Sequence, residues 1–562
     1  MIRINQIKII HDENKSYDYD TINDVLKAKV AKILRVSVDD MESFEIIRHS
    51  IDARKKPEIY HIYIVDVSLK NNSEEGVVKK CRNKDVSIIK PVRYAFPYEY
   101  QHGKEEDRRP VIIGAGPAGL FCGYVLAKHG FKPLILERGS DVDKRTEIVE
   151  HFWKSGELDE TTNVQFGEGG AGTFSDGKLN TMVKDKDGRG RAALEIFVEN
   201  GAPIDILYDA KPHIGTDILR DVVKNMRNNI IKWGGEVRFE SKVDEIEVSK
   251  DNEIKALKVG DECIPCSEAV LAIGHSARDT FYMLKNKNVE MNPKPFAVGF
   301  RVEHPQALIN YSQYKIADPK ALEPAPYKLT TTTDSGRGVY SFCMCPGGFV
   351  VNASSEKGRL AVNGMSYSKR DSKNANSAII ITVDPKDFGG DDVLSGVEFQ
   401  RGLEEKAFKA GNGKIPVEYY GKFKEAVSGE PDSTNEDDTL VQTQKDFKLI
   451  ENTPSMKGDY VFANVHDILP DDLNNAFVQG MEKFGRMIKG YNSKYALVSG
   501  VESRTSSPVR IVRGDNGESV NVKGLFPCGE GAGYAGGIMS AAMDGMKIAE
   551  YVAGRICKSE KK

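Results

Sequence analysis

The sequence predicts an α/β protein with a Rossmann-like dinucleotide-binding domain, preceded by one small α+β domain and interrupted by another. Three observations support this fold class. A strand, a glycine turn and a helix follow one another in VIIGAGPAGL, from residue 111. A second glycine-rich segment, GEGAGYAGG at 529–537, opens a helix near the end of the chain. The first hundred residues alternate between strand-like and helix-like patterns.

The N-terminal segment, residues 1–98, is expected to form a ferredoxin-like α+β domain. Its apolar start (2–10), helical spacing (22–34), two β-like runs (44–51 and 59–67), charged stretch (74–82) and final VSIIKPV follow the order β-α-β-β-α-β. Its single cysteine, Cys81, cannot hold an iron–sulfur cluster alone. The basic run at 48–56 is either a docking surface for a protein partner or a charged hairpin edge in solvent.

Composition limits the function classes. The chain has 562 residues, of which 40% are apolar and 29% charged, with a net charge of −4. This balance argues against a dedicated nucleic-acid or anionic-membrane binder. The start lacks the apolar core of a signal peptide, and no run of 18 apolar residues predicts a membrane span. Eight cysteines do not form a disulfide framework, so a cytoplasmic location is expected.

The remaining chain divides by its motifs. A polar linker is expected at 99–109 and the first part of the dinucleotide-binding domain, with a β-meander, at 110–290. An α+β substrate or cap domain should occupy 291–500, and the C-terminal part of the dinucleotide-binding domain 501–562.

The upstream loop, Gly114-x-Gly116-x-x-Gly119, has the strand-before and helix-after context that makes this motif specific. The glycines permit a tight turn, close approach of a pyrophosphate, and close helix–strand packing. Pro117 and Ala118 open the helix, whose free N–H groups favour an anion. Glu137, 23 residues after Gly114, ends the next strand beside Arg138, where a carboxylate can accept a ribose hydroxyl.

The downstream loop cannot be a second complete nucleotide-binding unit. After it the chain has room for one helix and no further strand. The whole arrangement resembles flavoproteins of the glutathione-reductase and p-hydroxybenzoate-hydroxylase type, in which the C-terminal strand, loop and helix return to one FAD domain. The resemblance implies one FAD held from both ends of the chain. Gly529 and Glu530 would meet the ribityl chain, and Gly536, Gly537 and Ile538 would lie beside the isoalloxazine, next to a positive helix end.

Longer segments are similar to a bacterial family of FAD-dependent dehydrogenases, usually described as NAD(P)/FAD-dependent oxidoreductases. These segments are NVQFGEGGAGTFSDGKLNT, KPHIGTD, LAIGHSARDT, FCMCPGGFVV and VESRTSSPVRIVR. Within that resemblance, further cofactor contacts are expected from the backbone of Val243 and from Gly169, Gly170, Gly172, Thr173, Ser175, Lys178, Ala272 and Gly274.

The candidate catalytic residues are Cys345, His213 and Arg504. Cys345 and Cys343 precede a Pro-Gly-Gly turn that can face the flavin, either as redox thiols or as pocket walls. His213, like His275, is a candidate proton donor or a packing residue. Arg504, like Arg510, can bind a carboxylate substrate or brace the backbone or FAD phosphates. Cys263-x-x-Cys266 lies in the predicted meander and indicates a structural role, and no metal site is expected.

These observations predict an FAD-dependent oxidoreductase that transfers hydride through flavin N5 to or from a small molecule. NAD(P)H would bind only transiently, because a second complete nucleotide-binding unit is missing. The alternatives are a flavin monooxygenase, whose usual loop differs from GEGAGY, and an electron-transfer or RNA-modifying flavoprotein that docks through the N-terminal domain. No nucleic-acid partner is expected.

Overall fold

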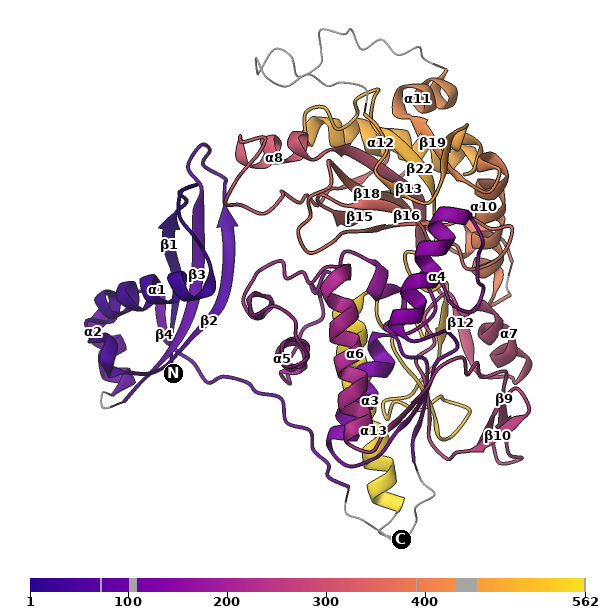
Figure 1. Cartoon of the computed structure of the whole chain (residues 1–562), viewed down its shortest axis with the longest axis horizontal. Helices are drawn as coiled ribbons and strands as arrows, with labels where there is room; N and C mark the ends of the chain where they lie inside the picture. Colours follow the sequence, from indigo (N-terminus) through magenta and orange to yellow (C-terminus); the bar gives the residue numbers. More distant parts are fainter. Residues whose placement is uncertain (71–72, 101–108, 391, 430–451, 560–562) are drawn as a thin grey trace.

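The computed structural model describes residues 1–70, 73–100, 109–390, 392–429 and 452–559 (Figure 1). The N-terminal domain stands apart on one side of the molecule (Figure 1). Its four strands pair in the order β2-β3-β1-β4, the ferredoxin-like arrangement that the sequence predicts. The elements are β1 (Ile2–Ile10), α1 (Tyr19–Leu34), η1 (Val38–Asp40), β2 (Met41–Asp52), β3 (Tyr60–Leu69), α2 (Glu74–Cys81) and β4 (Val86–Ile88).

Helix α1 shows why this domain folds. The side chain of Asp18 caps its first turn by accepting a hydrogen bond from the Thr21 N–H. Apolar residues at a spacing of four, from Ile22 to Leu34, are buried and pack with the sheet. Most of the expected linker, residues 101–108, lies outside the described residues.

The central sheet is parallel and confirms the predicted Rossmann-like fold. Its strand order is β24-β11-β5-β6-β7, and all four pairings are parallel. The strands are β5 (Val111–Ile113), β6 (Leu134–Leu136), β7 (Glu236–Arg238), β11 (Ala269–Leu271) and β24 (Leu525–Pro527). Every residue of β5, β6, β11 and β24 is buried, as expected for a sheet covered on both faces.

Helices from both ends of the chain cover one face of this sheet (Figure 1). They are α3 (Pro117–Lys128), α5 (Arg189–Glu199), α6 (Thr216–Lys232) and α13 (Ile538–Ser559). The other face packs against α7 (Arg278–Asn286) and the predicted meander, which consists of β8 (Glu245–Val248), β9 (Ile254–Val259) and β10 (Glu262–Pro265). Between these elements lie α4 (Val142–Ser155), η2 (Gly170–Phe174) and η3 (Ile204–Leu207).

A second α+β unit is inserted before β23 and carries the largest core. Its mixed sheet has the order β14-β15-β18-β13-β22-β19-β21. The strands are β13 (Phe296–Pro305), β14 (Thr330–Thr332), β15 (Gly338–Cys345), β18 (Asn374–Val383), β19 (Ile415–Tyr419), β21 (Tyr460–Phe462) and β22 (Leu497–Glu502). The expected boundary at 500/501 therefore falls inside β22.

The remaining elements surround this sheet or tie it to the central one. Strand β12 pairs with β23 and joins the inserted unit to the C-terminal segment. These elements are α8 (Gln306–Tyr314), α9 (Pro385–Phe388), α10 (Ser395–Gly411), α11 (Tyr420–Ser428), η6 (Val465–Asp467), α12 (Asp471–Met487), β12 (Met291–Pro293), β16 (Phe349–Asn352), β17 (Val362–Met365), β20 (Met456–Lys457) and β23 (Val509–Ile511). Among the described helices, none combines the length and apolarity that crossing a bilayer requires.

Candidate functional site

The two glycine-rich loops open on one cavity of about 350 Å³. It lies at the carboxyl ends of the parallel strands, where ligands of open α/β sheets bind. Most of the residues predicted to hold a cofactor line its wall. They are Gly114, Gly116, Pro117, Ala118, Glu137, Arg138, Gly170, Gly172, Ser175, Lys178, Val243, Ala272, Gly274, Glu530, Gly536, Gly537 and Ile538.

Four predicted contacts do not line the cavity: Gly119, Gly169, Thr173 and Gly529. They shape the loops behind the wall. Thr173 is fully buried, and its hydroxyl donates to the Glu168 carbonyl. Gly529 adopts a left-handed backbone (φ 74°) and donates its N–H to Asp544 at 2.8 Å. Val243 lines the cavity from the connection between β7 and β8 rather than from a strand.

Each of the three glycines in the upstream loop lacks a side chain for a different steric reason. A Cβ at Gly114, where φ is 104°, would lie 2.4 Å from the Ala272 carbonyl oxygen. A Cβ at Gly119 would lie 1.9 Å from the Gly114 oxygen. A Cβ at Gly116 would meet only Gly170 Cα, at 3.9 Å, so this position faces open space at the cavity wall.

Both helix N-termini at the cavity offer free N–H groups. Gly116 caps α3 without a side-chain hydrogen bond, and Pro117 occupies its first turn. The start of α13 is lined by Gly536 and Gly537, where an added Cβ would meet nothing within 4 Å. Such bare N-termini favour negatively charged groups. The cavity thus fits a ligand with an anionic centre near α3 and an electron-rich ring edge near α13.

Glu137 lies at the end of β6 and organises the loops around it. Its carboxylate accepts hydrogen bonds from the N–H groups of Ala115 (2.7 Å), Gly139 (3.0 Å) and Gly167 (3.0 Å). Two carboxylate oxygens have about four acceptor sites, so one is left for a ligand hydroxyl. Arg138 is held by Asp279 at 3.0 Å and lies over the Phe166 ring.

Glu530 also lines the cavity, and its Oε1 lies 2.9 Å from Nδ1 of His275. The other ring nitrogen of His275, Nε2, is buried without a partner among the described residues. Both side chains line the cavity. His275 therefore belongs to this wall, a position that the sequence alone did not distinguish from packing.

His213 is not at the cavity, which corrects its prediction as a catalytic residue. Its Nδ1 lies 2.5 Å from the Asp176 carbonyl oxygen and 3.6 Å from the Asp176 carboxylate. Asp176 is fully buried and also pairs with Lys178 (3.1 Å) and Arg370 (2.8 Å). Burial would raise the pKa of Asp176, but Lys178 and Arg370 hold it well below its usual range. His213 thus braces the carboxylate that positions Lys178.

Cys345, predicted as a catalytic residue, does not line the cavity either. The cysteine that lines it is Cys343. Cys345 is fully buried, with Sγ 3.2 Å from the Cys343 carbonyl oxygen. The pairing of β15 with β18 shifts register between Phe342 and Cys345, and Cys343 has a left-handed backbone (φ 45°). This irregularity turns the two thiols to different surroundings.

The environment of Cys343 favours its thiolate form. The neighbouring Cys345 side chain, together with the cations Lys178 and Arg301, lowers the pKa of the Cys343 thiol well below its usual range. The Arg301 guanidinium donates to the Cys343 carbonyl at 2.9 Å. Burial raises the pKa of Cys345, which stays protonated beside it.

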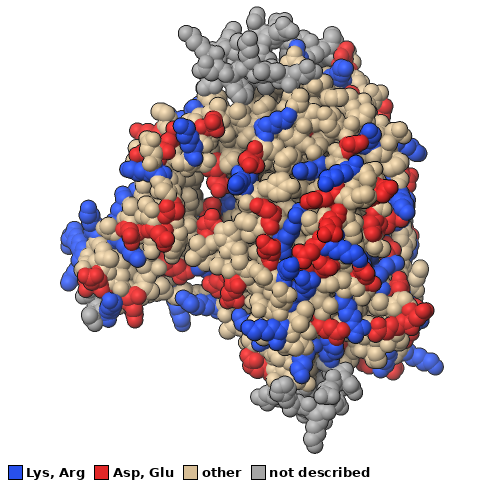
Figure 2. Space-filling model, viewed as in Figure 1, with Lys and Arg blue, Asp and Glu red and all other residues tan. Residues whose placement is uncertain are grey.

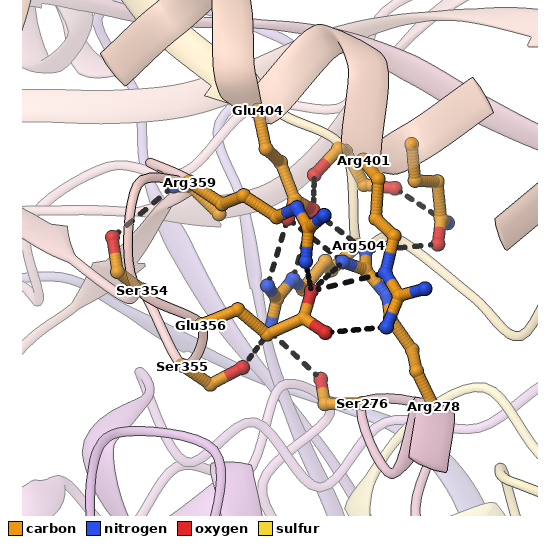
Figure 3. A network of polar contacts seen from close by, with 12 residues as sticks. Ser276, Arg278, Ser354, Ser355, Glu356, Arg359, Arg401, Glu404 and Arg504 are labelled. Carbon is orange, nitrogen blue, oxygen red and sulfur yellow. Dashed lines mark hydrogen bonds and ion pairs between the residues drawn. The ribbon is translucent and has the colours of Figure 1, made fainter. Parts of the chain in front are cut away.

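Arg504 lines the cavity, but its guanidinium N–H groups are already hydrogen-bonded to protein side chains, so it cannot bind a substrate carboxylate through two hydrogen bonds. It binds both oxygens of Glu404 (3.0 and 2.9 Å), and Arg278 binds the same carboxylate at 2.7 and 2.9 Å (Figure 3). Glu404 lies on α10, 100 residues before Arg504. The hydrogen-bond partners of Arg504 are the side chains of Glu404, Ser276 and Ser355, so this arginine connects α10 to the cavity wall. Arg510 likewise contacts backbone, donating to the Gly533 carbonyl at 3.4 Å.

No cluster of three or more His, Cys, Asp or Glu side chains suited to a metal occurs among the residues that the structure describes. Cys263 is exposed and Cys266 buried in the meander, so the two thiols lie in different surroundings. On the face in Figure 2, Lys and Arg are interspersed with Asp and Glu between wide areas of other residues.

Comparison with known proteins gives three family matches. Residues 295–505 match the family described as FAD-dependent protein, C-terminal domain-like. Residues 112–146 match an NAD(P)-binding Rossmann-like domain, and residues 1–68 match a domain of unknown function.

Three individual proteins are similar to this chain over different lengths. A protein of Clostridium beijerinckii described as uncharacterized is 47% identical over 560 residues, which is 98% of each chain. A protein of Claviceps purpurea named as a monooxygenase is 32% identical over 101 residues, 18% of this chain and 13% of its own. A geranylgeranyl bacteriochlorophyll reductase-like structure from Thermoplasma acidophilum is 11% identical with a TM-score of 0.33, and the match covers 80% of this chain and 79% of that one.

Proposed function

Since the chain belongs to the family of FAD-dependent proteins with this C-terminal domain, we propose that FAD binds in the glycine-lined cavity. We further propose that the enzyme, an FAD-dependent oxidoreductase, transfers hydride between the flavin and a small organic molecule. The observation that supports this most strongly is the convergence of two glycine loops and two bare helix N-termini on one cavity.

The residues present fit this cofactor. The space in front of Gly116 and the free N–H groups of α3 suit a pyrophosphate. Glu137 has acceptor capacity left for a ribose hydroxyl, and Glu530 is placed for a ribityl hydroxyl. The N-terminus of α13 stabilises negative charge at a ring edge. FAD supplies the ring atom, N5, that accepts or gives hydride.

Cys343 Sγ is proposed as the proton-handling group of this wall. As a thiolate beside Lys178 it can take the proton that an alcohol or amine substrate loses when its hydride leaves, and it can return that proton in the reverse direction. Asp176 fixes Lys178, and therefore the charge next to the sulfur. Arg504 is proposed to hold the wall through Glu404, without contacting substrate.

NAD(P)H is proposed as a transient electron donor only. Within the described residues, β5, α3 and β6 form a complete nucleotide-binding unit around the first glycine loop, whereas the second glycine loop connects β24 of the same sheet to α13. The unit at Gly114 is the one assigned to FAD, so any nicotinamide nucleotide must bind and leave within a turnover.

The test begins with the absorption spectrum of the purified protein, followed by anaerobic addition of NADH and then NADPH. Bound FAD should be released by acid and identified by chromatography. Bleaching of the flavin bands by one nucleotide supports the donor proposal and identifies it, whereas unchanged bands contradict it. Oxygen uptake coupled to a substrate would instead favour a monooxygenase.

A single substitution can test cofactor binding in the cavity without disturbing the fold. The backbone at Gly116 (φ −74°) is allowed for leucine, and a Cβ there would meet no protein atom closer than 3.9 Å. Gly116→Leu should therefore fold, while its side chain fills the space proposed for the cofactor. We expect at least a hundredfold loss of FAD affinity with unchanged circular dichroism. Gly402→Leu, on the exposed surface of α10, is the control. Normal FAD binding by Gly116→Leu would refute the assignment.

A further inference from the structure

A second and larger cavity, of about 1260 Å³, lies between the N-terminal domain and the rest of the protein. Its wall includes residues of β2 and β3 on one side and of the central body on the other. Figure 2 shows the hollow between the two parts. Backbone hydrogen bonds close one end: the His49 N–H donates to the Tyr208 carbonyl at 2.6 Å, and the Ala210 N–H donates to the His49 carbonyl at 2.8 Å.

This second cavity adjoins the proposed FAD cavity. Four residues, Lys178, Asn180, Phe342 and Cys343, line both. These residues separate the two cavities. Two of them, Lys178 and Cys343, are the cation and the thiol to which the proposed function gives a role beside the flavin. A molecule in the second cavity therefore approaches the reactive wall from the side opposite to the cofactor.

The N-terminal domain contributes a stack of rings to this wall. Tyr17 lies on His61 (centroids 3.8 Å apart, planes at 15°), His61 and His49 are nearly coplanar and edge to edge (5.1 Å, 10°), and His49 lies on Tyr63 (4.7 Å, 18°). The two histidines are also hydrogen-bonded at 2.9 Å. Burial lowers the pKa of both histidines, which keeps the rings neutral at pH 7. Neutral stacked rings favour a flat, aromatic ligand.

The body contributes an excess of cations. Six lysines and arginines of the body, together with Arg48 of β2, line the second cavity against three acids, Asp205, Asp209 and Glu323. Glu323 is already paired with Arg370 at 3.2 Å. Among the described residues neither Lys211 nor Lys369 forms an ion pair, and the acid that acts on Lys211 from a distance is Asp209, while burial lowers the pKa of this lysine.

We propose that the second cavity is the substrate site and that its substrate class is the aromatic carboxylic acids. The ring would lie against the stack headed by Tyr17, and the carboxylate would meet Lys211 and Lys369. The N-terminal domain is then a wall of the active site rather than an appendage. This inference rests on the proposed function for its reaction but on separate residues for its binding.

The experiment is calorimetric titration of the FAD-loaded protein with three matched pairs: benzoate and benzamide, 4-hydroxybenzoate and 4-hydroxybenzamide, and indole-3-acetate and indole-3-acetamide. Within at least one pair the acid should bind about tenfold more tightly than the amide, because an ammonium–carboxylate contact is charge-assisted. Lys211→Ala/Lys369→Ala should bring that ratio close to one. Lys250→Ala, an exposed lysine outside the cavity, should leave it unchanged.

A second variant tests the ring stack. Tyr17→Leu keeps an apolar side chain but removes the ring, so it should weaken acid and amide alike by about three- to tenfold. Three results would overturn the proposal: no binding of any acid at millimolar concentration, equal binding of acids and amides, or a ratio that survives the double variant. If the protein holds no FAD, the proposed function fails, but the same titrations still test this cavity because none of the substituted residues lines the FAD cavity.

Discussion

Replacing Glu404 by Gln is the most direct test of how the cavity wall is held. The Glu404 carboxylate is fully buried and accepts hydrogen bonds from Arg278, Arg504 and the Ser503 hydroxyl (2.6 Å). Burial alone would raise its pKa, but the two guanidinium groups hold the pKa well below its usual range. Glutamine keeps the volume and removes the charge, which leaves Arg504 facing an amide, whereas Arg278 keeps its ion pair with Glu356 at 2.6 Å.

The expected loss is large because the partners cannot reach water. Breaking a buried ion pair by removing one partner typically costs about 3–5 kcal/mol of unfolding free energy. The control is Glu405→Gln on the same helix, whose half-exposed carboxylate pairs with Arg359 at 3.0 Å. An exposed pair contributes about 0–1 kcal/mol. Urea unfolding followed by circular dichroism at pH 7 compares the two variants with the parent protein.

The outcome also bears on function. Since Arg504 and Ser276 join this network at the FAD cavity, Glu404→Gln should weaken FAD binding, whereas Glu405→Gln should not. If both variants lose less than about 1 kcal/mol, the two arginines have found other partners and the bracing role assigned to Arg504 is wrong.

Three further outcomes are expected. Alkylation of Cys343 by iodoacetamide, followed by mass spectrometry, should reach half its maximal rate at a pH well below the pKa of an ordinary thiol, and a midpoint near that of an ordinary thiol would contradict the thiolate assignment. Gly119→Ala should destabilise the protein by about 1–3 kcal/mol and weaken FAD binding, because its Cβ would lie 1.9 Å from a backbone oxygen, whereas Gly402→Ala should be neutral or stabilising. Burial raises the pKa of Glu303 to about 7, so the folded state holds a proton that the unfolded chain releases, and stability should fall as pH rises from about 4.5 through 7. Glu303→Gln should remove that decline, gaining at most about 3 kcal/mol over the parent between pH 5 and pH 8 in urea unfolding, and parallel pH profiles would contradict it.

The fold and the glycine-lined cavity were predictable because their signals are local. Gly114, Gly116 and Glu137 lie within one strand–helix–strand unit, so their spacing in the sequence fixes their positions in space. The N-terminal domain was predictable for the same reason, since each of its strands and helices has its own periodicity.

The reactive residues were harder because their positions depend on distant partners. In a regular strand, residues two apart share a face, so Cys343 and Cys345 would point the same way. The register shift against β18 breaks that rule, and no single-sequence pattern marks it. Likewise, the partner of Arg504 is 100 residues away, and a free arginine and a paired one look alike in sequence.

The close packing of α3 on α13 explains why loops from opposite ends of the chain form one site. A Cβ at Gly545 would lie 2.2 Å from the Ala118 carbonyl oxygen, so the two helices touch at backbone distance. Gly529 is equally tight, with a Cβ position 2.7 Å from Ala118 Cβ. Because both contacts fall on the first turn of α3, the position of one N-terminus fixes the other. The pyrophosphate end and the ring end of the cavity are therefore coupled through glycines that never touch the ligand, and a side chain at Gly545 should disturb both ends together.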